Sequence, residues 1–488
     1  MSVEWNPDPA AGMPVFKQIA RFYEERILKG DLPPGVRLPA ERELAVRLKV
    51  NRSTVSAAYE ELRAGGFVTS IKGSATRVCE LLWEEKPVPV PNWRRYTGSR
   101  AFDPAMSIYR RQHEAARIPG MINLTKGELS PDLMPLHLLQ ELAMEVDYSC
   151  PFSYHDDFRG DLGLRTTLAD TLQAEQGITV TPEHLLITSG VKHSLHLIAH
   201  TLLQPGDAIA VEGPSYLYAM GVFPAAGLRM VRLPVDSGGL IPEALPALVH
   251  KHRVRMVFTN PTFQNPTGTS LSSARRQKLL EVCESLRLPV VEDDPYGALS
   301  LDPGNPPPPS LKALNGGDRF VICLGTLSKT ATPGMRLGWI AAPLPVTGRL
   351  AQAKNRMGCS TSHAGERLAH RYLLSAAAQT HLATVRRILA LRRACMLQAL
   401  REHAGGLAQP AAPEAVPGGF YLWLRLKHPV PDRELVEAGI REGVLIYPGS
   451  LFGAEPGFLR LTYASVGEAE ITEGVRRLGR ALAGLAGG

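Results

Sequence analysis

Apolar residues in the first 80 positions recur at the spacing of successive helices. The first helix has one apolar face and ends near Gly30, before a Pro-Pro-Gly turn. A short second helix ends at the turn Lys49–Val50, and Asn51 is a good N-cap for a third helix. The apolar positions that predict the first two helices are Phe16, Ile19, Ala20, Tyr23 and Ile27, followed by Leu44, Ala45 and Leu48.

The third helix has an apolar side and a polar first turn. Its inward positions are Val55, Ala58, Tyr59 and Leu62. The side chains left on the outward N-terminal turn are Arg52, Ser53, Thr54 and Ser56. Two short strands, 67–71 and 76–78, follow around Gly73. This order predicts a winged helix-turn-helix, a fold that lays the start of its third helix in the major groove of DNA.

Arg52 suits a guanine edge or a phosphate, and the hydroxyl groups suit the DNA backbone. The alternative is a small helical bundle that serves only for packing.

From about Met121 onward, short apolar runs alternate with helical patterns. This alternation predicts βαβ units and a buried parallel sheet. A long Arg-rich helix, a strand-like run 420–424 and a terminal helix follow residue 375, and they predict a smaller α+β lobe. The strand-like runs of the sheet begin at Leu185, Ala208, Arg255, Leu288 and Phe320.

The chain therefore divides into three expected parts. Residues 1–80 form the winged helix-turn-helix, and residues 121–488 form an α/β domain whose small lobe spans about 375–488. Residues 81–120 form a linker, since the alternating prolines of 86–91 favour an extended backbone. This multidomain layout suits a chain of 488 residues.

Charge and cysteine usage narrow the function classes. Residues 13–78 hold 12 Lys and Arg against 7 Asp and Glu, so much of the net charge of +7 lies in the first module. A basic segment on a near-neutral body suits nucleic acid, although a solvated basic surface gives the same count.

The six cysteines are scattered without a CxxC pair, which excludes a zinc ribbon and a disulfide framework and suits a cytoplasmic protein. No apolar run of about 18 residues predicts a membrane span, and we expect no metal site.

Four polar motifs follow predicted strands of the α/β domain, where such sheets bind ligands. The turn 189–191 opens a helix whose N–H groups can hold a phosphate. Asn265 offers an amide, and Asp293 can keep a pyridine nitrogen protonated. Lys329 can form a Schiff base with an aldehyde, and Arg336 can clamp a phosphate. Each motif alone is weak, because ordinary turns, acidic loops and surface lysines give the same residues.

In combination and in this order, the motifs resemble fold-type I pyridoxal-phosphate enzymes of the aminotransferase group, over roughly residues 121–488. The resemblance implies pyridoxal 5'-phosphate as cofactor and Lys329 as the catalytic residue that bonds it. It further implies that Asp293 pairs with the ring nitrogen, that Tyr296 and Asn265 contact the phenolic oxygen, and that Tyr216 stacks on the ring. The implied phosphate cup consists of Ser189, Gly190, Val191, Thr326, Ser328 and Arg336.

Two further residues complete this implied site. Tyr154 resembles the tyrosine that reaches the phosphate of the partner subunit. Arg460 resembles the arginine that takes the α-carboxylate of a substrate.

The first module resembles the GntR-type winged helix in the segments 32–39, 41–45, 50–55, 58–62 and 72–76. This resemblance implies that Arg42, Arg52, Thr54 and Gly73 approach double-stranded DNA. Ser53 and Ser56 share the exposed turn and are further candidates. The sequence departs from the family at Ala75, where the wing usually carries a second glycine.

A GntR-like reader joined to an aminotransferase-like domain resembles the MocR/GabR group of bacterial regulators. The resemblance implies a homodimer that binds operator DNA and responds to a small amino-acid-like effector. We therefore expect a pyridoxal-phosphate-dependent transcriptional regulator. Two alternatives remain: a working aminotransferase that acts on an α-amino acid, and a regulator that senses pyridoxal phosphate itself.

Overall fold

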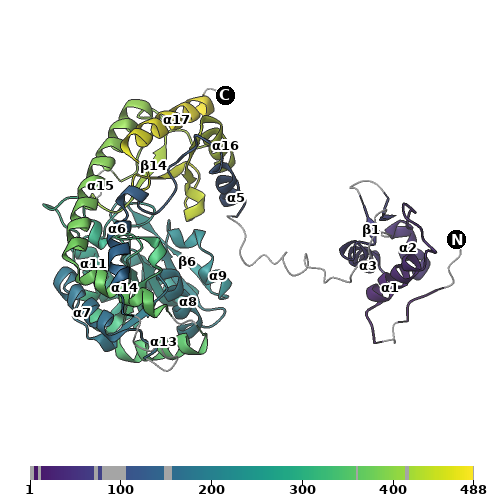
Figure 1. The fold of residues 1–488 in the computed structure, drawn as a ribbon, viewed down its shortest axis with the longest axis horizontal. Coiled ribbons are helices and arrows are strands. Elements are labelled where there is room, and N and C mark those ends of the chain that lie inside the picture. Colours follow the sequence, from purple (N-terminus) through teal and green to yellow (C-terminus); the bar gives the residue numbers. More distant parts are fainter. Residues whose placement is uncertain are drawn as a thin grey trace. The chain divides into compact units, whose positions relative to one another are not determined.

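Two compact units make up the chain, Met1–Arg100 and Ala101–Gly488 (Figure 1). The computed structural model describes residues 5–8, 12–70, 75–79, 106–147, 157–358, 361–412 and 417–486. Two predicted site residues, Gly73 and Tyr154, lie outside these ranges. Within the described ranges, no helix has both the length and the apolar character that crossing a membrane requires.

The first unit is a three-helix core with a small antiparallel wing. Asn51 caps the third helix as expected, because its side chain accepts a hydrogen bond from the Ser53 N–H at 3.0 Å. The inward positions of that helix are all buried against the first helix. The elements are α1 (Val15–Leu28), α2 (Glu41–Leu48), α3 (Arg52–Ala64), β1 (Val68–Thr69) and β2 (Arg77–Val78).

The larger unit is built on a seven-stranded sheet in the order β4-β12-β11-β10-β9-β5-β6. The five predicted strands are all present, as β4, β5, β9, β10 and β11. The full set is β4 (Leu185–Thr188), β5 (Ala208–Glu212), β6 (Arg229–Leu233), β9 (Val254–Thr259), β10 (Val290–Asp293), β11 (Val321–Thr326) and β12 (Gly338–Ala341).

Both faces of this sheet are buried, which explains the continuous apolar runs of its strands. Successive residues of a strand enter opposite clusters: Leu185 and Ile187 pack on one side, and Leu186 packs on the other. Helices α7 (Leu162–Gln176), α11 (Ser273–Ser285) and α14 (His363–Leu374) cover the first side, whereas α8 (Val191–Leu202) and α13 (Leu344–Arg356) cover the second. The remaining helices of this lobe are α6 (Leu136–Met144), α9 (Val222–Ala225), α10 (Leu245–His252) and α12 (Gly317–Phe320), beside the hairpin of β7 (Val235–Asp236) and β8 (Gly239–Leu240).

The five predicted strands run parallel, as expected, but the sheet also contains one strand of the opposite direction that the sequence did not predict. Strand β12 runs antiparallel to both β11 and β4. Only residues 327–337 join β11 to β12, and a parallel return needs a crossover of about a dozen residues or more, usually a helix. The short connection therefore reverses the chain, and it also holds Ser328, Lys329 and Arg336.

The small lobe is an antiparallel sheet, β13-β14-β17-β16, packed against helices. Its long helix α15 (Ala376–His403) starts against the core of the large lobe at Ala378 and continues into the core of the small lobe. Figure 1 shows α15 in green along one side of the larger unit. The other elements are β13 (Ala408–Pro410), β14 (Tyr421–Leu426), α16 (Asp432–Glu442), β15 (Val444–Leu445), β16 (Tyr447–Pro448), β17 (Phe458–Thr462) and α17 (Glu468–Ala486).

The small lobe also contains residues that the sequence places in the linker. Residues 106–115, expected within the linker, form helix α5 (Met106–Ala115) and belong to the larger unit. Arg111 forms a bidentate ion pair with Glu437 of α16 at 2.7 and 2.8 Å, and Gln112 donates to the Ile446 carbonyl at 2.6 Å. Strand β3 (Ile122–Asn123) pairs in parallel with β15. These contacts are distant in sequence, so local pattern did not reveal them.

Candidate functional site

Most of the predicted cofactor residues line one cavity of about 270 Å³ at the ends of the central strands. The strand ends of β4, β10 and β11 bring the separate motifs together, as expected for a doubly wound sheet. The lining includes Gly190, Val191, Tyr216, Asn265, Asp293, Tyr296, Thr326, Ser328, Lys329 and Arg336.

Asp293 lies at the floor of this cavity and is 2% exposed. Its Oδ2 accepts a hydrogen bond from the Tyr216 hydroxyl at 2.6 Å, whereas its Oδ1 is buried without a partner among the described residues. Burial raises the pKa of Asp293 to about 7, and the Tyr216 hydrogen bond opposes that rise. A buried carboxylate oxygen that lacks a donor fits a ligand that brings an N–H group to it.

Lys329 reaches the same cavity from the loop after β11. Its Nζ donates to the Gly127 carbonyl at 2.5 Å, and its charge lies close enough to Asp293 to lower the pKa of that carboxyl. The amine is therefore held in place by a neutral acceptor and has no carboxylate bound directly to it in the described part of the chain. Such a contact can be exchanged for a ligand without breaking an ion pair.

The predicted phosphate cup is formed by the turn before α8 and the loop after β11. Gly190 has φ +94°, and a Cβ there would stand 3.5 Å from the Arg336 guanidinium. Arg336 donates to the Ser189 carbonyl at 2.9 Å, which brings its charge to the start of α8. Thr326 donates to the Ser328 hydroxyl at 3.0 Å. Hydroxyl groups, a guanidinium and a helix N-terminus together suit a phosphate.

One contact of the phosphate cup, between Ser189 and His193, was not predicted from the sequence. The Ser189 N–H donates to Nδ1 of His193, 3.0 Å away, and burial lowers the pKa of His193 to about 4. A neutral ring accepts this hydrogen bond at neutral pH. His193 lies one helical turn after Ser189, and this spacing was the available signal.

Arg460 is buried beside the cavity and makes polar contacts only with neutral groups in the described chain. Its guanidinium donates to Asn265 Oδ1 at 2.9 Å and to the Thr125 carbonyl at 2.5 Å, and its Nε has no partner in the ranges that the structure describes. Three aromatic rings surround it, with their centroids 4.2, 4.8 and 5.3 Å from its central carbon: Tyr421, Phe452 and Tyr447. A buried cation without a carboxylate is costly and is stabilised by an incoming anion.

Tyr421 is the main site residue that sequence reasoning missed. Besides stacking on Arg460, its hydroxyl accepts a hydrogen bond from Tyr296 at 3.1 Å. It therefore joins the cofactor side of the cavity to the arginine. The strand-like run that begins at Phe420 showed its secondary structure but gave no sign of this contact.

Of the four residues predicted on the outward turn of α3, Arg52 and Ser53 are exposed, whereas Thr54 and Ser56 are half-buried. Arg52 forms an ion pair with Glu41 of α2 at 3.3 Å, and its side chain is 57% exposed. Ser56 also donates to Glu41, at 3.4 Å. Arg42 is also exposed. Glu41 was not singled out from sequence, yet it fixes the direction of Arg52 before any contact with DNA.

We expect the pH dependence of stability to report on Asp293. An unfolded Asp ionises near pH 4. Between about pH 4 and 7 the folded protein therefore keeps a proton that the unfolded chain has lost, so stability falls as pH rises through this window. In cofactor-free protein, Asp293→Asn should reduce this fall, and Asp170→Asn, at an exposed position of α7, should not. Thermal midpoints measured across this range check the prediction, and equal slopes in all three proteins would contradict it.

Removal of a positive charge from α3 should weaken DNA binding more than removal of one from another helix of the first unit. Arg52→Ala should lower DNA affinity by about 1–3 kcal/mol if Arg52 makes a bidentate base contact, and by less if it contacts phosphate. Arg21→Ala is the matched control, because Arg21 lies on α1 and pairs with Glu25. The measurement is DNA binding over a range of salt concentrations, in which affinity should fall steeply as salt rises. Equal losses in both variants would argue against groove docking by α3.

Two family models match the chain. Residues 119–478 match the aminotransferase class I and II family, and residues 16–78 match the bacterial regulatory proteins of the gntR family. An uncharacterized HTH-type transcriptional regulator of Bacillus subtilis, YdfD, is 34% identical over 97% of this chain and 97% of its own length. Aromatic-amino-acid aminotransferase 1 of Thermococcus litoralis is 31% identical over 81% of this chain and 96% of its own.

Solved structures agree for the larger unit. Kynurenine aminotransferase of Pyrococcus horikoshii aligns with a TM-score of 0.72 at 30% identity, over 78% of this chain and 95% of that one. The α-aminoadipate aminotransferase LysN of Thermus thermophilus aligns with a TM-score of 0.71 at 30% identity, over 81% and 99%. The aminotransferase fold implies pyridoxal phosphate as the cofactor. The chain thus belongs to the aminotransferase class I and II family, in the MocR-like group of regulators that join this domain to a GntR-type DNA-binding domain.

Proposed function

We propose that this pyridoxal-phosphate-dependent DNA-binding regulator senses a small amino acid through Arg460 and acts as a homodimer. The observation that carries the proposal is the buried guanidinium of Arg460, which lies beside the cavity of Lys329 without a carboxylate partner in the described chain. An α-carboxylate would supply the missing charge, and a guanidinium binds it bidentately.

The residues of the cavity fit the cofactor. The unpartnered Oδ1 of Asp293 would accept the hydrogen of a protonated ring nitrogen. Tyr216 would stack on the ring, Asn265 and Tyr296 would contact its phenolic oxygen, and Lys329 would bond its aldehyde. The cup of Ser189, Gly190, Val191, Thr326, Ser328 and Arg336 would hold the phosphate. When bound, the cofactor supplies an electron sink that makes the α-proton of an amino acid acidic.

The residues of the chain then divide the work of recognition. The carboxylate of Asp293 would stabilise a positive charge inside the cavity. Arg460 would bind the carboxylate of the amino acid and so fix its orientation. The free amine of Lys329 would accept or return a proton at the α-carbon of the amino acid.

A route from the effector site toward the linker passes through aromatic side chains. Arg460 contacts the ring of Tyr447, and Tyr447 packs edge-on against Tyr109 of α5, with ring centroids 5.2 Å apart. Phe452, also against Arg460, belongs to the same cluster as Tyr216 and Tyr109. Helix α5 is the first described element after the segment that joins the two units. An effector that shifts Arg460 would therefore alter the packing of Tyr447 against α5. A change in DNA affinity of about 5–150-fold needs only about 1–3 kcal/mol of coupling.

Lys329→Ala should abolish the covalent bond to the cofactor. The phosphate cup and Tyr216 should still retain some cofactor without a bond. Borohydride reduction followed by mass analysis of the protein measures this, together with the visible absorption band of the bound cofactor. Lys192→Ala is the matched control, because Lys192 is the other lysine that lines the cavity. A reducible adduct that persists in Lys329→Ala would assign the bond to another lysine.

Arg460→Ala should separate cofactor binding from effector sensing. The variant should keep the cofactor spectrum and basal DNA affinity, yet lose the response to amino acids. DNA binding across an amino-acid panel, measured beside the spectrum, tests this. A variant that responds like the parent would contradict the carboxylate role and favour sensing of pyridoxal phosphate alone.

A working aminotransferase is the second candidate function. Lys329 and Asp293 line the same cavity, and Arg460 bonds to Asn265 at its edge. The aminotransferase of Thermococcus litoralis is 31% identical to this chain. Release of an oxo-acid from an amino donor over many turnovers would support the enzyme. A single turnover or none, with DNA binding altered, would support the sensor.

A further inference from the structure

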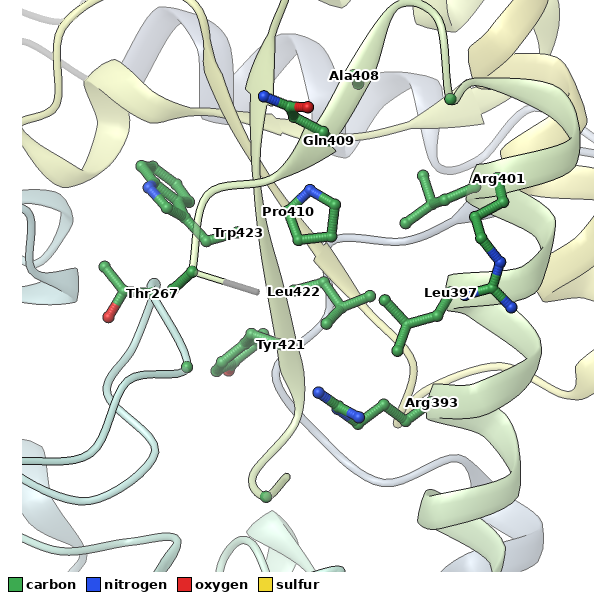
Figure 2. A pocket seen from close by; sticks show the side chains of 15 residues that line it. Thr267, Arg393, Leu397, Arg401, Ala408, Gln409, Pro410, Tyr421, Leu422 and Trp423 are labelled. Atoms are coloured by element: carbon green, nitrogen blue, oxygen red, sulfur yellow. The ribbon is translucent and has the colours of Figure 1, made fainter. Parts of the chain in front are cut away.

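A second cavity, of about 370 Å³, lies in the small lobe between α15 and the sheet (Figure 2). We call it the α15 pocket. Figure 2 shows Arg393, Leu397 and Arg401 of α15 along one side, and Thr267 on the other. Leu422 of β14 points between them. Of the site residues described above, only Tyr421 is among the described residues that line this pocket.

The α15 pocket carries two positive charges and no described acidic side chain in its lining. Arg393 is half-buried and Arg401 is exposed, and the described structure gives neither of them a hydrogen bond or an ion pair. Residues 393, 397 and 401 recur every four positions, so they share one face of α15. Arginines usually find a carboxylate or carbonyl, as Arg386 and Arg392 of the same helix do. The two free guanidinium groups therefore define an anion-attracting wall.

The rest of the lining is mainly apolar. Leu397, Leu400, Leu422 and Pro410 supply aliphatic surface between the two arginines. A pocket of a few hundred Å³ with apolar walls and a few polar groups is the usual form of a small-molecule site. The matching ligand has an apolar body and an anionic group.

The α15 pocket shares a wall with the effector site. Tyr421 lines the pocket, and its ring stacks on Arg460, 4.2 Å from centroid to guanidinium carbon. Thr267 and Gly268 also line it, and they follow Asn265, which accepts a hydrogen bond from Arg460. A Cβ at Gly268 would stand 3.2 Å from the Tyr421 carbonyl, so the loop and β14 are in close contact.

We propose that the α15 pocket is a second ligand site for an organic anion with an apolar body, and that its occupancy changes the affinity of Arg460 for the effector. The first half depends on the pocket alone. The second half rests on the proposed function of Arg460. The ligand acts through Tyr421 and the Asn265 loop, which contact both sites.

Binding of phenylbutyrate to the full-length holoprotein tests the first half. Calorimetric titration should show saturable binding to the parent, and Arg393→Ala and Arg401→Ala should each weaken it about tenfold or more. Arg387→Ala is the matched control, since Arg387 is exposed on α15 and does not line the pocket. The neutral analogue phenylbutanol should bind the parent at least about tenfold more weakly than phenylbutyrate does. Absence of saturable binding, or equal affinity in the parent and both pocket variants, would overturn the proposal.

Repeating the titration with Arg460→Ala locates the ligand. Phenylbutyrate should still bind this variant, because its site is the α15 pocket. Loss of binding in Arg460→Ala with retention in Arg393→Ala would place the ligand at the effector site and overturn the second site. That result would leave the proposed function intact.

The coupling is tested with an amino acid that shifts the cofactor spectrum. Saturating phenylbutyrate should change the apparent affinity of the parent for this amino acid by at least about fivefold. In Arg393→Ala, phenylbutyrate should leave the affinity for the amino acid unchanged. An unchanged affinity in the parent would overturn the coupling. Absence of any amino-acid response in the parent, without phenylbutyrate, would instead overturn the proposed function.

Discussion

The buried guanidinium of Arg460 holds together the parts of this molecule that matter for function. It lies on the small-lobe strand β17 and donates to Asn265 of the large lobe and to the Thr125 carbonyl. Aromatic rings from β14, β16 and the segment before β17 enclose it. The described structure gives this cation no carboxylate, although isolated buried charges are normally paired. Neutral acceptors and ring faces therefore stabilise the charge, and the Nε–H of Arg460 is left without a partner among the described residues.

The sheet creates the conditions for this contact. Its central strands are buried on both faces, so polar side chains gather at the strand ends, where Asp293 and Lys329 lie. The small lobe then brings Arg460 and Tyr421 against that edge. Helix α5 and strand β3 also belong to the small lobe, and Tyr109 of α5 lies in the same apolar cluster as Phe452, which packs on Arg460.

Sequence alone predicted the parts that local pattern controls. The three reader helices, the cap at Asn51 and the five strand-like runs are confirmed, because helical spacing and short apolar runs act within a few residues. The antiparallel β12 was missed, since its direction depends on the length of one loop. The cage of Arg460 was also missed, because Tyr421, Tyr447 and Phe452 are brought together only by sheet register and lobe packing. The pairing of Arg52 with Glu41 joins two helices and leaves no pattern in the sequence.

If an effector and DNA bind to one coupled system, each must change the affinity for the other, and this reciprocity can be measured. A DNA site selected from a random library serves as operator. The affinity of the holoprotein for an amino acid that shifts its cofactor spectrum is then measured with and without saturating DNA. DNA should change the amino-acid affinity by the same factor by which the amino acid changes the DNA affinity. An amino-acid affinity that is the same with and without DNA would contradict it.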